Sequence, residues 1–151
     1  MHTHYSAQPA SSSSILVIEE HPFQRRALAR KLNGLGVPRV LEASSGSDAL
    51  ELLRANGGSI VLILSDVERP QVDGLELLRR LATGAPRTAV AVLSAPQRQA
   101  LKSIEATAVE YGLHLVGVLE KPVSDDALRA VLVRALSSST RVRVRAARAE
   151  L

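Results

Sequence analysis

The chain lacks cysteine and tryptophan, and its aromatic residues are limited to one phenylalanine and two tyrosines. Without cysteine, neither a disulfide framework nor a thiolate metal site can form, which fits a reducing, cytoplasmic compartment. Because aromatic residues make up only 2% of the chain, aliphatic side chains must form almost all of the core. An aromatic ligand cage is therefore not expected.

Long apolar runs are also missing. The longest uninterrupted apolar stretches have five or six residues, whereas a membrane-spanning helix needs about 20. Residues 1–14 are polar and rich in serine, without the apolar segment of a secretory signal. A chain of 151 residues has the length of one domain. We expect a disordered leader over residues 1–13, a single domain over residues 14–137 and no membrane association.

The net charge of +4 is placed unevenly. Residues 1–140 carry 15 Lys and Arg against 14 Asp and Glu, whereas residues 141–151 carry four Arg against one Glu. A basic segment can attract an acidic surface, but this one has none of the interleaved aromatic residues that single-strand binders use for base stacking. We expect residues 138–151 to form a basic tail or linker, and nucleic-acid binding is not expected.

An acidic residue follows one of the longest apolar runs. The stretch Ile60–Leu64 is followed by Ser65 and Asp66, and then by Pro70 and the pair Asp73-Gly74. This pattern predicts a buried strand that stops at a carboxylate, turns at a proline and continues into a helix.

Three other predicted strands end with polar groups in the same way. Ile15–Ile18 runs into Glu19-Glu20, Ala89–Leu93 runs into Ser94, and Leu115–Glu120 runs into Lys121-Pro122. In an open parallel sheet, ligands bind beyond the carboxyl ends of the strands, so these groups would meet at one edge. Carboxylates bind hard divalent cations, a carboxylate can accept a phosphoryl group, and a cation with a lysine offsets the charge of that group. The set suits phosphoryl transfer.

Helical periodicity alternates with these strands. We expect a short strand at residues 39–43 and five helices, which begin near Pro22, at Ala49 after a turn over residues 44–48, at Gly74, at Gln97 and at Ser124. Strands that alternate with helices predict an α/β fold in which a five-stranded parallel sheet carries helices on both faces.

The ordered series Glu19-Glu20, Asp66, Ser94-Ala95 and Lys121-Pro122 resembles the receiver domains of response regulators in two-component signalling. The resemblance extends from Ser14 to about Leu136. It implies the flavodoxin-like (βα)5 fold and a phosphoacceptor domain that is not a turnover enzyme. It also implies that Asp66 takes its phosphoryl group from a sensor histidine kinase or a phosphotransfer protein. Residues 20–25 and 105–122 are similar to receivers that precede EAL-type cyclic-di-GMP phosphodiesterase domains. The chain is then either a single-domain regulator or the receiver part of a longer protein with an effector domain outside this chain.

The resemblance also implies a magnesium site. Glu19, Glu20, Asp66 and the backbone carbonyl of Glu68 would bind Mg²⁺, although most members of the family carry at least one Asp at the first two positions. Glutamate at position 20 adds a methylene group to a ligand of a cation that demands tight octahedral geometry. Lys121 would pair with a phosphoryl oxygen, and the peptide bond before Pro122 would be cis.

Ser94 would donate a hydrogen bond to the phosphoryl group and draw its loop inward. Many receivers carry an aromatic residue three positions before the lysine to follow this movement, but this chain has Val118. We therefore expect the change to be carried by the loop after Ser94 and the fourth helix. A homodimer through the fourth helix, fifth strand and fifth helix is one expected output.

Two alternatives belong to other classes of protein. A degenerate receiver would serve as a phosphorylation-independent interaction module, which Glu20 and Val118 favour and the joint presence of Asp66, Ser94 and Lys121 opposes. A phosphatase of the haloacid dehalogenase type also begins with an Asp at a strand end. It needs a second Asp two residues further on, where this chain has Glu68.

Overall fold

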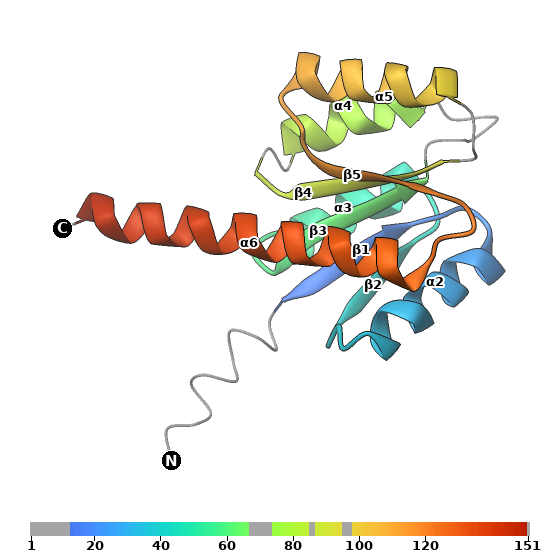
Figure 1. The fold of residues 1–151 in the computed structure, drawn as a ribbon, viewed down its shortest axis with the longest axis horizontal. Coiled ribbons are helices and arrows are strands. Elements are labelled where there is room, and N and C mark those ends of the chain that lie inside the picture. Colours follow the sequence, from blue (N-terminus) through green and yellow to red (C-terminus); the bar gives the residue numbers. More distant parts are fainter. Residues whose placement is uncertain (1–12, 67–73, 85–86, 95–97, 151) are drawn as a thin grey trace.

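The computed structural model describes residues 13–66, 74–84, 87–94 and 98–150. A five-stranded sheet lies at the centre, in the order β2-β1-β3-β4-β5 (Figure 1). All the strand pairs are parallel. The strands are β1 (Ser14–Ile18), β2 (Val40–Ala43), β3 (Ile60–Asp66), β4 (Ala89–Ser94) and β5 (His114–Glu120). The helices are α2 (Pro22–Gly34), α3 (Gly46–Asn56), α4 (Gly74–Gly84), α5 (Arg98–Tyr111) and α6 (Asp125–Glu150).

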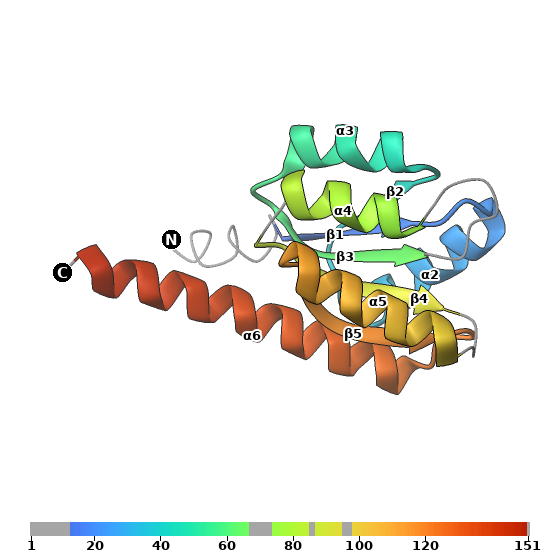
Figure 2. The same cartoon turned by 90° about the horizontal axis from the view of Figure 1, so that it is seen from above.

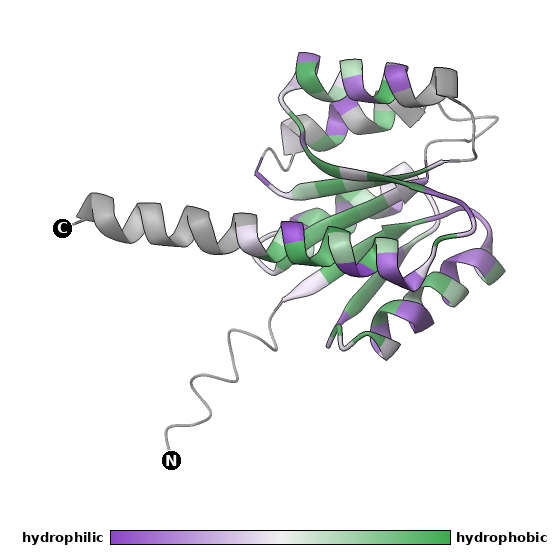
Figure 3. Ribbon diagram, viewed as in Figure 1, coloured by the Kyte–Doolittle hydropathy of each residue, from purple (hydrophilic) through white to green (hydrophobic). Residues whose placement is uncertain are grey.

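The predicted α/β class with helices on both faces of a parallel sheet is confirmed. One buried apolar cluster joins α2 and α6 to the sheet, and it includes Leu28, Leu64 and Leu128. A second cluster joins α3, α4 and α5 to the other face, and it includes Ile63 and Leu81. Because the inner strands are covered on both faces, they are continuously apolar instead of alternating with polar residues. Figure 3 shows this hydrophobic character along the central strands.

Successive residues of β1 divide between the two clusters. Ile15 and Val17 lie in the cluster beneath α2 and α6, whereas Leu16 and Ile18 lie in the cluster beneath the other three helices. This division follows from the period of two residues along a strand. It also sets the direction of the side chains that follow β1.

The helix boundaries follow the predicted signals except at the start of α3 and the end of α6. Helix α2 begins at Pro22 as expected, and Gly112 after α5 has the left-handed φ of 69° that suits glycine at a helix end. Helix α3 begins at Gly46 and not at Ala49, because Ser45 is its N-cap and accepts a hydrogen bond from the Asp48 backbone N–H at 3.1 Å. The predicted turn over residues 44–48 is therefore partly the first turn of the helix.

Helix α6 is longer than the apolar pattern indicates. It continues to Glu150 and projects past the sheet in two perpendicular views (Figures 1 and 2). Residues 138–150 thus extend the last helix, and their role as a linker stays a prediction. The leader proposed for residues 1–13 lies outside the described residues except for Ser13.

Packing between β5 and α6 depends on a glycine. A Cβ atom on Gly117 would lie 2.8 Å from Cγ2 of Val131, a distance at which the β-branched side chain has to move. We expect Gly117→Ala to lower the free energy of unfolding by about 1–3 kcal/mol through overpacking. Urea unfolding followed by circular dichroism measures the change.

The matched control is Gly58→Ala, since a Cβ atom at Gly58 meets nothing within 4 Å. If steric overlap is the cause, Val131→Ala should recover part of the loss, so that the double variant is more stable than the sum of the single effects. If the two changes in unfolding free energy were strictly additive, the close approach to Val131 would not be the reason that this position requires glycine.

Candidate functional site

The strand order β2-β1-β3-β4-β5 reverses direction between β1 and β3. From β1 the chain adds β2 on one side of the sheet, and from β3 it adds β4 and β5 on the other side. In doubly wound sheets, the crevice at the carboxyl ends of two such strands is the usual ligand site. Ile18 pairs with Ser65 in the register of these strands, so the next residues, Glu19 and Asp66, lie level with one another. Both carboxylates are almost fully buried, with exposed fractions of 2% and 3%.

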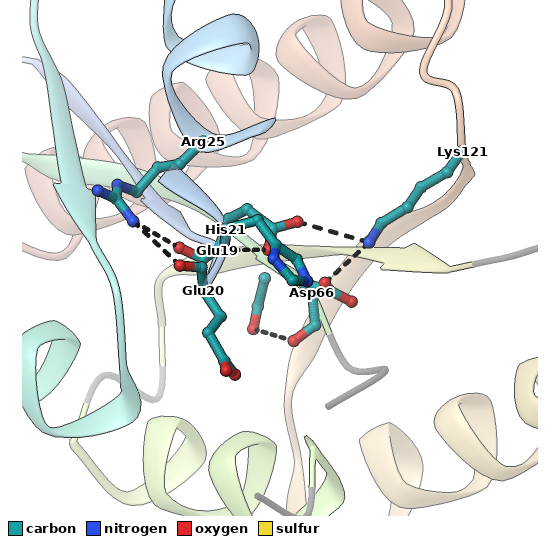
Figure 4. Close-up of polar contacts among 7 residues, drawn as sticks. Glu19, Glu20, His21, Arg25, Asp66 and Lys121 are labelled. Atoms are coloured by element: carbon teal, nitrogen blue, oxygen red, sulfur yellow. Dashed lines mark hydrogen bonds and ion pairs between the residues drawn. The ribbon is translucent and has the colours of Figure 1, made fainter. Parts of the chain in front are cut away.

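Lys121 completes this pair from the end of β5. Its Nζ atom lies 2.8 Å from Oδ2 of Asp66 and 3.5 Å from Oε1 of Glu19 (Figure 4). Its backbone N–H donates a hydrogen bond to the carbonyl oxygen of Ser94 at 2.9 Å, which fixes the lysine against the end of β4. The peptide bond between Lys121 and Pro122 is cis, as predicted.

The ammonium group of Lys121 is held in its charged form. Burial lowers its pKa, but the hydrogen bond and negative charge of Asp66, with a further contribution from Glu19, outweigh burial and raise the pKa above its ordinary value. Two buried carboxylates nevertheless share this one ammonium group, which leaves one negative charge in excess among the three groups.

The second oxygen of Glu19 is held by the chain itself. Its Oε2 atom accepts a hydrogen bond from the backbone N–H of His21 at 3.0 Å. Glu19 is therefore oriented from two sides, by His21 and by Lys121. Glu20, in contrast, is exposed, and its side chain extends away from Lys121 in Figure 4.

The predicted site residues thus fall into three groups. Glu19, Asp66 and Lys121 are in direct contact, and Ser94 is buried beside them, with 3% of its surface exposed. Glu20 lies next to the cluster with its carboxylate turned outward. Glu68 lies outside the described residues. The roles assigned to all of these residues stay predictions.

The chemistry of these donors fits a hard divalent cation. Within the described ranges, no group of three or more His, Asp or Glu side chains is close enough to hold a metal ion. Magnesium, however, is commonly bound through one or two carboxylates and several waters. Two buried carboxylates with an excess negative charge provide such a pair of ligands and the electrostatic attraction.

Sequence reasoning missed Arg25 and Glu42. The guanidinium group of Arg25 donates to the backbone carbonyl of Glu19 at 2.9 Å (Figure 4). Its Nε atom lies 3.3 Å from Oε1 of Glu42. These two residues are 17 positions apart and lie on a helix and an edge strand. No local pattern joins them, so only the pairing of β1 with β2 could have indicated the contact.

An open cavity lies directly beside the cluster. It has a volume of about 440 Å³ and is lined by residues of α2 and of the segment after β5, together with Glu19 and Leu93. Lys121 is part of its wall. Glu19 is therefore the carboxylate of the cluster that borders this cavity.

The fold and the buried cluster define a doubly wound α/β domain with a carboxylate–lysine pair at its switch point. A family model described as the response regulator receiver domain matches residues 15–133. The chain belongs to the response regulator receiver domain family, a class of signalling domains.

Curated relatives agree with this family. The autoinducer 1 sensor kinase/phosphatase LuxN of Vibrio campbellii is 33% identical over 85% of this chain and 14% of its own length. The positive alginate biosynthesis regulatory protein of Pseudomonas aeruginosa is 34% identical over 81% of this chain and 46% of its own length. The chain thus spans less than half of each of these relatives.

Solved structures share the fold. The signal receiver domain of an HD domain-containing protein from Pseudomonas fluorescens is 29% identical, with a TM-score of 0.72 over 88% of this chain and 93% of that one. A receiver domain protein from Clostridium thermocellum has a TM-score of 0.73 at 24% identity, over 86% of this chain and 98% of that one. In the part of this chain that the structure covers, no helix is both long and apolar enough to cross a membrane.

The ion pair of Lys121 gives a stability prediction. Lys121→Met should lower the free energy of unfolding at pH 7 by about 1–3 kcal/mol, because two buried carboxylates lose the cation they share. Partial exposure of the lysine, at 29% of its side chain, keeps the effect below that of a fully buried pair. Urea unfolding of both proteins measures the difference.

The pH dependence has a defined sign. Because the pKa of Lys121 is raised in the folded protein, its contribution is complete below the ordinary lysine pKa of about 10.4. It is lost only as the pH rises through the higher folded value. Lys31→Met is the control, since the Lys31–Asp125 pair is exposed at 44% and 56% and should contribute about 1 kcal/mol or less. Equal losses in both variants would contradict a special role for the buried pair.

Proposed function

We propose that Asp66 accepts a phosphoryl group from a phosphohistidine on a sensor histidine kinase or a phosphotransfer protein. The observation that carries this proposal is the buried Asp66 carboxylate, held 2.8 Å from the Lys121 ammonium group at the switch point of the sheet. The names of two matched relatives, a sensor kinase/phosphatase and the sensor histidine kinase RcsC of Salmonella typhi, support this class of partner.

The transfer is a displacement at phosphorus. An oxygen of Asp66 forms a bond to phosphorus, while the bond between phosphorus and the donor imidazole nitrogen breaks and its electron pair leaves with the imidazole. The product is an acyl phosphate on Asp66. Lys121, which contacts the carboxylates of Asp66 and Glu19 before the transfer, then pairs with a phosphoryl oxygen, where its charge stabilises the added negative charge.

We assign Mg²⁺ to Glu19, Glu20, Asp66 and the backbone carbonyl of Glu68. When bound, the ion would offset negative charge on the phosphoryl oxygens. The support is the pair of buried carboxylates, Glu19 and Asp66, which lie level at the ends of β1 and β3.

Ser94 is assigned the second contact to the phosphoryl group. Its burial beside Lys121 and its position at the end of β4 support this role. Val118 packs, partly buried, against the cluster that also contains Ile104 of α5, so a change at Ser94 would pass to α5 without an aromatic rotation. The altered surface would be the one formed by α5, β5 and α6, which would serve as a homodimer or effector contact.

The remaining assignments concern the protein of which this domain would be part. We place the domain in the cytoplasm, without turnover beyond its own phosphorylation and dephosphorylation. An effector domain outside this chain, of the EAL phosphodiesterase kind, is the proposed output. This rests on the likeness of residues 20–25 and 105–122 to receivers that precede such domains.

Phosphoryl uptake tests the main proposal. Incubation with acetyl phosphate and magnesium chloride should add one phosphoryl group, detected by mass spectrometry, and chelation of magnesium should prevent it. Asp66→Asn should abolish uptake, because an amide oxygen is a poor nucleophile and carries no charge.

The control is Asp126→Asn, the same change at a carboxylate that is 97% exposed and pairs only with Arg129 among the described residues. It should take up phosphoryl as the wild-type protein does. A phosphorylated Asp66→Asn protein would place the acceptor elsewhere. Failure of beryllofluoride with magnesium to bind the wild-type protein would favour an interaction module that does not use phosphate.

The reach of Glu20 gives a separate prediction. Glu20→Asp should tighten magnesium binding, because the shorter side chain suits the compact octahedral shell of the ion, whereas Glu20→Gln should weaken it by removing a charge. Magnesium titration of the isotope-labelled proteins by nuclear magnetic resonance measures the three affinities. Equal values would show that Glu20 is not a ligand.

A further inference from the structure

Arg25 contacts the backbone of the acidic segment from the side opposite the site. Its Nη1 atom donates a hydrogen bond to the carbonyl oxygen of Glu19 at 2.9 Å and lies 3.5 Å from that of Glu20. Figure 4 shows both contacts between Arg25 and the two carbonyl oxygens. One side chain thus contacts two consecutive carbonyl groups just after β1.

Glu42 of the edge strand β2 fixes Arg25 in turn. Its Oε1 atom lies 3.3 Å from Nε of Arg25, and its Oε2 atom lies 3.3 Å from Nη1 of Arg26. The side chains of Arg25 and Glu42 are only 19% and 21% exposed, whereas that of Arg26 is 64% exposed. The inner pair is therefore shielded from water, which strengthens charge-assisted hydrogen bonds relative to those on the surface.

The rest of the segment is held by its own backbone. Glu19 N–H donates to the carbonyl of Ala43 at 3.0 Å, and His21 N–H donates to the Glu19 carboxylate at 3.0 Å. These bonds fix the start of the segment and the Glu19 side chain, and the contacts from Arg25 hold the carbonyls of Glu19 and Glu20. The direction of the peptide planes that carry both acidic side chains thus depends on this arginine.

We propose that Arg25, fixed by Glu42, is a positioning residue for the divalent cation. This inference rests on the proposed function, in which Glu19 and Glu20 are cation ligands. Arg25 acts through the backbone of Glu19 and Glu20, and it fixes the peptide planes from which both side chains extend. Residues that orient metal ligands in this way have large effects on metal affinity without touching the metal.

The charge of Arg25 makes the proposal easy to separate from simple electrostatics. A positive charge near a cation site repels the cation, so its removal would tighten binding if charge were its only effect. A positioning role predicts the opposite result. The sign of the change in magnesium affinity therefore decides between the two.

The experiment is a titration of isotope-labelled wild-type, Arg25→Gln and Arg26→Gln proteins with magnesium chloride, followed by nuclear magnetic resonance. We expect Arg25→Gln to weaken binding about tenfold, with the largest shift differences at the amides of Glu19 and Glu20. Arg26→Gln removes the same charge and also takes away an ion pair with Glu42. In the described part of the chain, however, Arg26 forms no hydrogen bond to Glu19 or Glu20. It should bind magnesium at least as tightly as the wild-type protein.

Arg25→Lys keeps the charge but has a single ammonium group, which cannot reach Glu42 and both carbonyls together. A loss of magnesium affinity in Arg25→Lys would therefore result from the changed geometry and not from a lost charge. This variant serves as the test if circular dichroism shows that Arg25→Gln does not fold. Unchanged or tighter binding in the folded Arg25 variants would overturn the positioning role. If wild-type protein itself does not bind magnesium, the proposed function fails first, and the two failures are thereby distinguished.

Discussion

Two carboxylates held out of water at one edge of the sheet need a compensating charge, and Lys121 is the group that supplies it. Asp66 and Glu19 follow strands whose apolar residues are buried on both faces, so the sheet itself carries these acids into the interior. An unpaired buried charge costs several kcal/mol. The segment after β5 therefore has to bring its ammonium group to this edge. Because the backbone of Lys121 is also bonded to Ser94, one ion pair joins the ends of β1, β3, β4 and β5.

The same dependence explains how a chemical change at Asp66 could alter the fold around it. A phosphoryl group would add negative charge where one ammonium group already serves two carboxylates. A different arrangement of Lys121 and the end of β4 would then have the lowest free energy. The domain would shift toward the conformation that binds the new charge better. In this proposal, stability and switching use the same contact. The hydrogen bond from Lys121 to Ser94 connects that contact to the segment before α5.

Much of this arrangement was predictable because the strands are covered on both faces. Continuous aliphatic runs that end in polar residues placed Glu19, Asp66, Ser94 and Lys121 at one edge, and the ordered motif identified the topology. The start of α3 was misplaced because Ser45, not a later residue, caps the helix. The length of α6 was missed because the arginines of residues 141–151 were interpreted as a basic tail or linker, although Arg and Ala are good helix formers. The bond between Arg25 and Glu42 was missed because it joins a helix to an edge strand. A charged residue in an amphipathic helix normally predicts a side chain that is exposed to solvent.

The different positions of Glu19 and Glu20 follow from the pleat of β1. Ile15 and Val17 point toward α2 and α6, and two residues further on Glu19 extends to the same side, where Lys121 lies. Glu19 already uses one oxygen for the His21 N–H and the other for Lys121. Each carboxylate oxygen has about two lone pairs, so Glu19 can share only what remains with a cation. In the proposed site, Asp66 and Glu20 must then provide more of the coordination, and the outward-facing Glu20 has to turn inward to do so. Since Arg25 binds the carbonyls of both glutamates, the geometry of the backbone, more than the number of acidic groups, would set the affinity of the proposed site.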